Sequence, residues 1–451
     1  MTVVIKRFRA GSPGSAVTIL ILVSLALAVG LAACAPGRQE GNARALAPVK
    51  PGVEVFLEKH LDLVRGKRVG LITNPTGTDS RLRTTIDLFL ANPHIRLVAL
   101  FGSEHGVRGN AQAGEQVGFT IDAKSRLPEF SLYSLSGKPE LGMLKDMDEY
   151  MRSFDTTATG KIPDGTMLQG IDIMIFDIQD VGSRVYTYIA TMAYAMQACA
   201  ESGIPFVVLD RPNPTNGLDF EGTILEYPTH SSPVGLYPIP SRFAMTMGEL
   251  ALLFNDRFLP KKASLTVIPM EGWKRGMWFD ETGLPWVMPS PNMPTLDTAT
   301  VYSGLVYIEG TNVSEGRGTT RPFELFGAPW IDGSELAGKL NGLGLPGAIF
   351  REAWFTPSFS KFKGELCGGC QVHVTDRSCF RSFETSLHII KTIRDMYPGR
   401  FQFHQKYFDL VLGTSKVREA LEAGRPVREI VEGLTSGLQA FAELRKPYLL
   451  Y

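Results

Sequence analysis

The sequence carries no excess of charge of either sign. Its 451 residues include 46 Lys and Arg and 46 Asp and Glu. Proteins that bind nucleic acid through its phosphates usually carry a basic excess, so this balance argues against nucleic acid as a partner. Hydrophobic residues make up 44% of the chain and charged residues 20%, a composition typical of a globular protein with a large core. A chain of this length is expected to form two or three domains.

The sequence also lacks several signatures of cofactor sites and of nucleophilic catalysis. The first predicted strand is followed by Thr73-Asn-Pro-Thr-Gly77 rather than by the G-x-G-x-x-G of dinucleotide-binding proteins, and no G-x-x-x-x-G-K-[ST] occurs. The seven histidines are scattered and no H-E-x-x-H is present, so no metal site is indicated. A G-x-S-x-G nucleophile elbow is absent as well. We therefore expect neither a cofactor nor a bound metal.

The N-terminal segment has the pattern of an export signal. Basic residues at positions 6, 7 and 9 precede an apolar run over residues 17–31. The following Leu31-Ala-Ala-Cys34 resembles the lipobox of bacterial lipoproteins, with Cys34 as the acylated residue; a plain signal peptide with an incidental cysteine is the alternative. We expect residues 1–34 to be removed or acylated as a lipoprotein signal and residues 35–50 to form a flexible tether. The mature protein would then be an exported lipoprotein of the cell envelope, anchored to the membrane on the periplasmic side or in the outer membrane.

Cysteine is scarce, with five residues in the whole chain. Cys367, Cys370 and Cys379 lie close together in the sequence and could supply three zinc ligands, but only His373 is near enough to serve as a fourth. In an exported chain we expect a disulfide among these cysteines rather than zinc. The sequence does not determine which two would pair.

Apolar runs and helical periods alternate beyond residue 50, which predicts an α/β fold with a doubly wound sheet. Residues 95–101, for example, form an apolar run whose length suits a buried strand. Further strands are expected at residues 67–73, 171–176, 204–209, 265–269, 301–308 and 371–375. Helices are expected at residues 82–90 after an N-cap at Ser80, at 141–151, at 189–199 before a stop at Gly203, at 247–258, at 383–390 and at two short segments within 421–434. The rest of residues 107–170 is expected to be an irregular excursion that lines the site.

Polar residues follow four of the predicted strands directly. Because the carboxyl ends of parallel strands meet at one edge of the sheet, where α/β proteins bind ligands, we expect these side chains to form a site. Each of them taken alone could equally be a helix cap or half of an ion pair. The residues are Asn74, Glu104, Asp177, Gln179, Asp180, Asp210, Arg211 and Asn213.

A pair of carboxylates is the chemistry that fits this site best, because glycoside hydrolysis needs one group as acid and a second as nucleophile or base. Glu104 is the first candidate, since partial burial at a strand end suits a carboxyl to donate a proton. Glu315, beside Arg317 in a glycine-flanked loop, is preferred as the second over Asp177, Asp180 and Glu309. Arginines at these loops could bind an anionic group of the substrate, although surface ion pairs are the alternative; they are Arg184, Arg211, Arg317 and Arg321.

Six motifs resemble those of the exo-β-N-acetylmuramidase (NamZ) family of peptidoglycan glycosidases. They are FGSEHG at residues 101–106, FDIQDVGSRVYTY at 176–188, LDRPNP at 209–214, PSPNMP at 289–294, EGTNVSEGRGT at 309–319 and YLLY at 448–451. The resemblance extends from about residue 52 to the C-terminus. A second cysteine, Cys370, three residues after the family's Cys367, departs from the family pattern and leaves the redox state of that segment open.

The resemblance implies a fold, an activity and a set of site residues. The fold would be a Rossmann-like N-terminal domain, placed at residues 51–262, and a smaller α+β C-terminal domain at residues 263–451, with the active site in the cleft between them. The activity would be release of terminal N-acetylmuramic acid from the non-reducing ends of peptidoglycan fragments, with Glu104 of G-x-E-H-G as the catalytic acid. A non-catalytic muropeptide-binding lipoprotein and a glycosidase for another amino sugar are the alternatives. The motifs add His105 to the catalytic residues and Tyr186, Asn292 and Asn312 to the substrate-binding residues.

N-acetylmuramic acid carries a lactyl carboxylate, which gives an arginine at the site a function. Arg184, Arg211 and Arg317 can all lie at the expected edge of the sheet. Arg211 is slightly favoured for contact with the carboxylate, because Pro212 stiffens its turn.

Overall fold

The computed structural model describes residues 48–109, 119–132 and 167–451, and the chain from Ala47 onward forms one compact unit. The predicted signal peptide with Cys34, nearly all of the predicted tether and the predicted helix at residues 141–151 lie outside the described residues.

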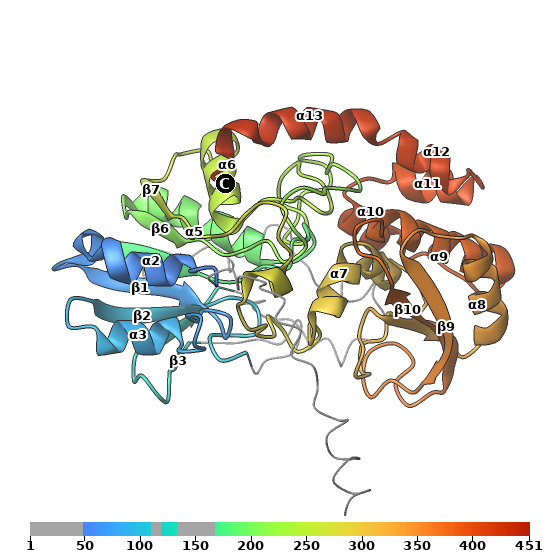
Figure 1. The fold of residues 1–451 in the computed structure, drawn as a ribbon, viewed down its shortest axis with the longest axis horizontal. Helices are drawn as coiled ribbons and strands as arrows, with labels where there is room; N and C mark the ends of the chain where they lie inside the picture. Colours follow the sequence, from blue (N-terminus) through green and yellow to red (C-terminus); the bar gives the residue numbers. More distant parts are fainter. Residues whose placement is uncertain (1–47, 110–118, 133–166) are drawn as a thin grey trace, which may run out of the picture. The chain divides into compact units, whose positions relative to one another are not determined.

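A seven-stranded sheet organises the first part of the described fold (Figure 1). Its order is β3-β4-β2-β1-β5-β6-β7, and neighbouring strands are parallel except β3 and β4. Numbered along the chain, the parallel strands follow the order 3-2-1-4-5-6 of the Rossmann fold, which confirms the predicted doubly wound sheet. The strand order reverses between β1 and β5, where such sheets bind ligands. The strands are β1 (Arg68–Thr73), β2 (Arg96–Gly102), β3 (Thr120–Ile121), β4 (Pro128–Ser131), β5 (Ile173–Asp177), β6 (Phe206–Leu209) and β7 (Leu265–Ile268).

Side chains of the parallel strands alternate between two cores, one on each face of the sheet. On β1, Val69 and Leu71 belong to the core that also contains residues of α2 (Gly52–Lys59) and α3 (Thr85–Ala91). Ile72 belongs to the opposite core, with residues of α5 (Tyr188–Ser202) and α6 (Met247–Arg257). This second core continues into the C-terminal half of the chain, so the two halves share one hydrophobic interior.

The helix ends agree with the sequence in part. Gly203 ends α5 in the left-handed conformation, with φ of 71°, as predicted. Thr246 and Glu249 form a capping box at the start of α6. The predicted N-cap at Ser80 is wrong, because α3 begins after Thr84, whose side chain accepts a hydrogen bond from the N–H of Asp87.

The predicted excursion at residues 107–170 is wrong in part, because its described residues include β3 and β4, which extend the sheet. β4 pairs with β2 in parallel, and β3 pairs with β4 in the antiparallel sense. Such short strands carry too few residues for a periodic signal to be recognised.

The C-terminal half contains a smaller antiparallel sheet of order β8-β10-β9, on which α8 packs. The predicted strand at residues 301–308 is wrong, because these residues end α7 and continue as the 3-10 helix η5. The side chains of residues 301–308 are buried on all sides, and an apolar run of that length does not distinguish a buried helix from a strand. The elements are η1 (Leu61–Val64), η4 (Phe279–Thr282), α7 (Leu296–Leu305), η5 (Val306–Gly310), β8 (Leu325–Ala328), α8 (Gly333–Gly342), β9 (Ala348–Phe355), β10 (Cys367–Val374), α9 (Ser382–Met396), α10 (Gln405–Leu412), α11 (Lys416–Glu422), α12 (Val427–Glu432), α13 (Thr435–Arg445) and η6 (Lys446–Tyr448).

Two of the predicted segment boundaries need correction. Val49, placed in the tether, is buried against Met270 and Trp273, so the folded unit begins before residue 51. The predicted domain boundary at residues 262 and 263 precedes β7, which pairs with β6 and completes the seven-stranded sheet. The N-terminal sheet therefore takes residues from the segment assigned to the second domain.

The expected disulfide does not form, since Cys367, Cys370 and Cys379 are free thiols. Cys367 and Cys370 lie on the same strand, β10, three residues apart, so their side chains point to opposite faces of the sheet. Burial raises the pKa of the Cys370 thiol to about 12. Cys370 therefore behaves as a small apolar core residue.

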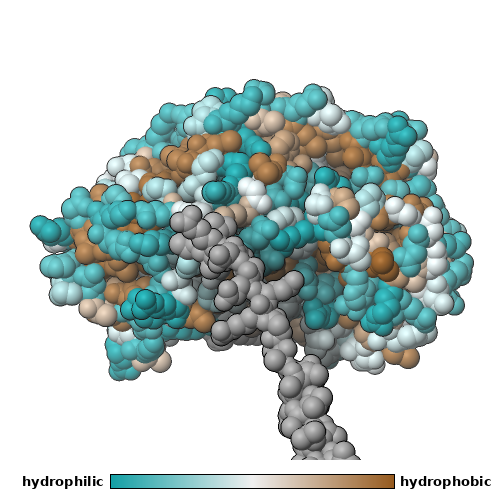
Figure 2. Space-filling model, viewed as in Figure 1, coloured by the Kyte–Doolittle hydropathy of each residue, from teal (hydrophilic) through white to brown (hydrophobic). Residues whose placement is uncertain are grey.

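Hydrophilic and hydrophobic side chains are interspersed on the face of the molecule in Figure 2. Among the helices that the structure describes, none has the length and apolar character needed to span a bilayer.

Candidate active site

The turn after β2 presents Glu104 at the carboxyl edge of the sheet. Two successive residues, His105 and Gly106, adopt left-handed conformations with φ of 76° and 75°. A non-glycine residue in that region is uncommon, and such backbone is found preferentially at functional sites. A Cβ at Gly102 would come within 3.0 Å of the Cα of Gly106, so the tight turn requires glycine there.

Glu104 is buried, with a relative exposure of 8%, and its carboxylate faces the start of α5. The hydroxyl of Thr187, the N-cap residue of α5, donates a hydrogen bond of 2.7 Å to Oε2 of Glu104. The N-terminus of a helix carries a partial positive charge that stabilises a nearby carboxylate. The hydrogen bond and the helix end together hold Glu104 in one orientation.

A cluster of tyrosines lies beside Glu104. The ring of Tyr186 packs edge-on against Tyr188 at 4.8 Å and against Tyr302 of α7 at 5.7 Å. Burial raises the pKa of Tyr302 well above its usual value, and the charges of Glu309, Glu104 and Asp180 raise it further. Tyr302 therefore lies within electrostatic range of three carboxyl groups. This position of Tyr302 was not predicted, because residues 301–308 were expected to form a strand.

Asp180, three residues beyond β5, is 3% exposed. Its Oδ1 accepts a 2.7 Å hydrogen bond from the backbone N–H of Gly182. Its Oδ2 is buried and has no hydrogen-bond partner in the described structure. Burial raises the pKa of Asp180 to about 7, although backbone N–H groups of its own loop oppose the shift.

Glu315 is buried in a cluster of charges. Nζ of Lys361 lies 3.0 Å from Oε2 of Glu315, and Nε of Arg317 lies 3.5 Å from Oε1. Arg317 also pairs with Glu309 at 2.7 Å, and the hydroxyl of Tyr407 donates to Glu309. Two carboxylates and two cations therefore compensate one another in this loop. Lys361 was not singled out in the sequence, because it lies 46 residues from Glu315.

Two neighbouring strand exits leave a buried polar atom without a partner in the described structure: Nδ2 of Asn74 and Oδ2 of Asp180. Oδ1 of Asn74 accepts hydrogen bonds from the backbone and hydroxyl of Thr76, so only the amide nitrogen remains. Most buried polar atoms in proteins have a partner, so two such atoms at the carboxyl edge of the sheet are consistent with a ligand site.

Arg211 is not free to bind a ligand with its whole guanidinium. It forms a bidentate ion pair with Asp177, at 2.6 Å through Nε and 2.9 Å through Nη2. Nη2 also donates to the carbonyl of Thr78. Asp177 and Arg211 are 0% and 5% exposed, so the pair is a buried structural link between the β5 and β6 exits.

The predicted contact of Arg184 with substrate is wrong. Its guanidinium is fully buried and donates to the carbonyls of Thr223, Ile239, Val411 and Leu412 at 2.6–3.1 Å. Burial lowers its pKa to about 10. Arg184 thus joins the β5 exit to the end of α10, and the acceptors lie too far away in the sequence to be foreseen.

Asp210 also has a structural role in place of the predicted substrate contact. Its carboxylate accepts hydrogen bonds from the hydroxyls of Thr246 and the C-terminal Tyr451, both at 2.7 Å. The backbone N–H groups of Gly248 and Arg211 donate to its other oxygen at 2.7 and 2.9 Å. Burial raises the pKa of Asp210 to about 6.

Three predicted substrate-binding amides hold loops together instead. Gln179 donates to the carbonyls of Asp180 and Pro212, Asn213 donates to the carbonyl of Met245, and Asn312 bonds the backbone of residues 400 and 402. Asn292 is buried at 6% exposure. Backbone groups are among the partners of each of the first three, and Asn213 also accepts from the hydroxyl of Thr215, so these side chains stabilise turns.

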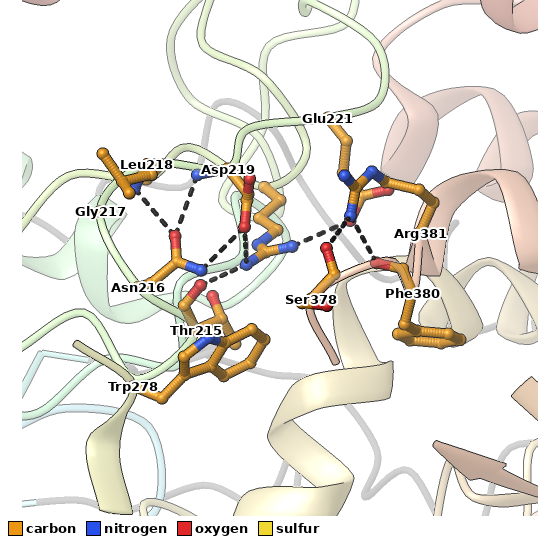
Figure 3. Close-up of polar contacts among 12 residues, drawn as sticks. Thr215, Asn216, Gly217, Leu218, Asp219, Glu221, Trp278, Ser378, Phe380 and Arg381 are labelled. Atoms are coloured by element: carbon orange, nitrogen blue, oxygen red, sulfur yellow. Dashed lines mark hydrogen bonds and ion pairs between the residues drawn. The ribbon is translucent and has the colours of Figure 1, made fainter. Parts of the chain in front are cut away.

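The loop after the β6 exit is likewise fixed by its own polar side chains (Figure 3). Oδ1 of Asn216 accepts from the backbone N–H groups of Leu218 and Asp219. Glu221 accepts from the N–H of Phe383 at 3.1 Å, which ties this loop to the start of α9.

Among the described residues, no group of three His, Cys, Asp or Glu side chains is arranged to hold a metal ion.

Comparison with known proteins identifies the family. The chain is 50% identical over 404 residues to the peptidoglycan β-N-acetylmuramidase NamZ of Bacillus subtilis strain 168, covering 89% of this chain and 91% of the relative. It is similar to two crystal structures of DUF1343 family proteins from Bacteroides fragilis NCTC 9343, each covering 90% of this chain and 99% of the other. Their TM-scores are 0.78 and 0.68 at 36% and 31% identity.

The sequence also matches family descriptions along nearly all of the described fold. Residues 69–155 and 152–297 match the N-terminal region of exo-β-N-acetylmuramidase NamZ, and residues 300–451 match its C-terminal region. The division between the two regions therefore falls after β7, in agreement with the sheet. The chain belongs to the exo-β-N-acetylmuramidase NamZ family.

Proposed function

We propose that this protein is an exo-acting glycoside hydrolase that releases terminal N-acetylmuramic acid from the non-reducing ends of peptidoglycan fragments. The observation that carries the proposal is the placement of Glu104: a buried carboxyl at the ligand-binding edge of a Rossmann-like sheet, held by Thr187. The activity named for the Bacillus subtilis relative supports the same reaction.

Glu104 is the proposed general acid. It would donate its proton to the glycosidic oxygen as the bond from that oxygen to C1 of the sugar breaks, and the fragment would leave as a neutral alcohol. Positive charge develops on the sugar ring in this step, so nearby carboxylates stabilise the transition state. Water then supplies the hydroxyl at C1 and returns a proton to the enzyme.

Glu315 is the proposed second carboxylate, and His105 is proposed to assist Glu104. The two cations beside Glu315 compensate its charge, and its Oε1 has no hydrogen-bond partner in the described structure, although Arg317 lies 3.5 Å away. His105 is 5% exposed and follows Glu104 directly in the strained turn.

Arg317 is the best remaining candidate for binding the lactyl carboxylate of the substrate. Its charge acts on Tyr302, and the charge of Glu104 acts on the same hydroxyl. Arg184 is enclosed by carbonyls and Arg211 is paired with Asp177, so Arg317 replaces Arg211 as the favoured residue. Its pairing with Glu309 must loosen or adapt when a carboxylate binds.

The activity is tested with chromogenic β-glycosides of N-acetylmuramic acid and N-acetylglucosamine. We expect hydrolysis of the muramic acid glycoside and little or none of the glucosamine glycoside. Preferred hydrolysis of the glucosamine glycoside would indicate a glycosidase of another specificity. Binding of muropeptides without hydrolysis of either glycoside would instead favour a binding protein.

Export and acylation at Cys34 complete the proposed function. An apolar run followed by Leu31-Ala-Ala-Cys34 supports a lipid anchor, which would place the enzyme beside its peptidoglycan substrate. We expect Cys34→Ser to abolish incorporation of labelled fatty acid and to release the protein from membranes. Cys379→Ser is the matched control and should change neither. Unchanged membrane fractionation of the Cys34→Ser protein would contradict the anchor.

A further inference from the structure

The carboxyl group of Asp180 is built to present one oxygen. Oδ1 is engaged by the N–H of Gly182 at 2.7 Å, and the N–H groups of Val181 and Ser183 also stabilise the carboxylate. Oδ2, on a side chain only 3% exposed, has no hydrogen-bond partner in the described structure. Leaving a buried carboxyl oxygen unpaired is costly, so such an atom calls for an explanation.

Two tyrosines lie within electrostatic range of Asp180. The charge of Asp180 acts on the hydroxyls of both Tyr186 and Tyr302, whose rings pack edge-on at 5.7 Å. Tyr302 packs in turn against Phe323 at 4.7 Å. A partner for Oδ2 must supply a hydrogen-bond donor, and an apolar part beside that donor would suit the neighbouring tyrosine rings.

The chemistry of these surroundings narrows the choice of partner. A water molecule bonded to Oδ2 and to a tyrosine hydroxyl could fill this place when no sugar is bound, and the sugar would displace it. A carboxylate, such as the lactyl group, has no hydrogen to donate to this oxygen. A secondary amide with a methyl group fits: its N–H donates to the oxygen and its methyl packs on the rings.

We propose that Asp180 accepts a hydrogen bond from the N–H of the 2-acetamido group of the sugar, with the acetamido methyl against Tyr186 and Tyr302. The proposal rests on the proposed function, which supplies an N-acetylated sugar. It gives Asp180 a task separate from that of the arginine at the lactyl group. Asp180 selects for the acetamido group, which muramic and glucosamine sugars share, and leaves the distinction between these two sugars to other residues.

The test measures binding and turnover separately in purified full-length protein. Binding of N-acetylmuramic acid and of its 2-deoxy analogue, which lacks the acetamido group, is measured by calorimetry for the wild type, Asp180→Asn and Asp180→Ala. Hydrolysis of the matching chromogenic glycosides is measured in parallel. Asp172→Asn is the control, because Asp172 immediately precedes the same strand at its other end and pairs with Arg68 on the surface.

We expect both Asp180 variants to weaken binding of N-acetylmuramic acid by about 10- to 150-fold, the loss of one hydrogen bond to a charged group. Binding of the 2-deoxy analogue should change less than about threefold, and Asp172→Asn should alter neither. The preference for N-acetylmuramic acid over its 2-deoxy analogue should therefore be lost in the two Asp180 variants and kept in Asp172→Asn.

Two results would overturn the proposal: an unchanged preference in both variants, or an equal loss for both ligands, which would show that Asp180 only supports its loop. Asp180→Asn keeps the size of the side chain, so it decides the matter if Asp180→Ala fails to fold. A wild type that binds N-acetylmuramic acid through Asp180 but hydrolyses no glycoside would refute the proposed function and leave this inference standing. A wild type that neither binds nor hydrolyses would refute both.

Discussion

Asp180 and Asp210 lie at the exits of adjacent strands and have opposite surroundings. Both follow adjacent parallel strands of the sheet, both are almost fully buried, and burial raises the pKa of each. Asp210 has four donors on its two oxygens, including the hydroxyl of the C-terminal Tyr451. Asp180 has one oxygen bonded to its own loop and the other without a partner in the described structure.

The difference separates a structural carboxylate from a binding one. A carboxylate whose two oxygens already accept hydrogen bonds from the protein has no acceptor left for a ligand, and its removal leaves all of those donors without an acceptor. A buried carboxylate with one oxygen that accepts no hydrogen bond lowers stability unless a ligand supplies the missing donor. Position at a strand exit is shared by both residues, so only the count of donors tells their roles apart.

The sharpest test of this contrast is to truncate each residue to alanine. Asp210→Ala leaves two hydroxyls and two backbone N–H groups without their acceptor, and we expect a loss of about 2–4 kcal/mol of unfolding free energy. Asp180→Ala should cost less than about 1.5 kcal/mol, because its Oδ2 has no bond to lose. Denaturant unfolding of both variants measures the difference. Equal losses would mean that Asp180 is as structural as Asp210.

The dependence of stability on pH sharpens the comparison further. Asp180 has a pKa of about 7 in the folded protein, above its ordinary value near 4, so the folded state binds more protons between these limits. Its effect on stability is therefore most favourable at low pH and is lost as the pH rises through 7. We expect Asp180→Asn to gain roughly 1–3 kcal/mol relative to the wild type between pH 5 and pH 8.

Thermal or denaturant unfolding at several pH values checks this prediction. Asp172→Asn is the control: the guanidinium of Arg68 holds the pKa of Asp172 below its ordinary value, so Asp172 does not titrate in this window. A difference between Asp180→Asn and the wild type that stays constant from pH 5 to pH 8 would show that Asp180 is not buried as described.

The smallest expected effect comes from the C-terminal residue. Tyr451→Phe removes one of the four donors to Asp210 and also an acceptor for the N–H of Met270, so we expect a loss of about 1–2 kcal/mol. Tyr448→Phe is the matched control, because its hydroxyl bonds the exposed Asp256 and should contribute less than about 0.5 kcal/mol. If the two variants are equally stable, the C-terminus does not support Asp210 as the contacts indicate.

The sequence predicted the doubly wound sheet well, for physical reasons. A buried parallel strand is a continuous apolar run, and the polar residue that ends it marks the carboxyl edge of the sheet, as Glu104 does. The residues 301–308 were mistaken for a strand because a helix buried on all sides has the same apolar composition.

The roles of the individual site residues could not be predicted in the same way. Arg184 and Asp210 are occupied by partners 227 and 241 positions away in the chain, and no local pattern marks such contacts. Tyr302 and Lys361 were missed for the same reason, since only the packing of α7 and of the 309–321 loop brings them to the site. A sequence motif thus indicates where the site lies, whereas the number of hydrogen-bond donors around each side chain indicates what it does.

The role of Glu104 as general acid is best examined with Glu104→Gln on a pair of muramic acid glycosides. Glutamine keeps the shape and the acceptor for Thr187 but has no proton to donate, so turnover of a glycoside with a poor leaving group should fall by about 10²-fold or more. A glycoside with a good leaving group needs little protonation, so the substitution should lower its turnover much less. Glu201→Gln, at the other end of α5, is the control and should match the wild type on both. Near-normal turnover of the glycoside with the poor leaving group by Glu104→Gln would show that Glu104 is not the general acid.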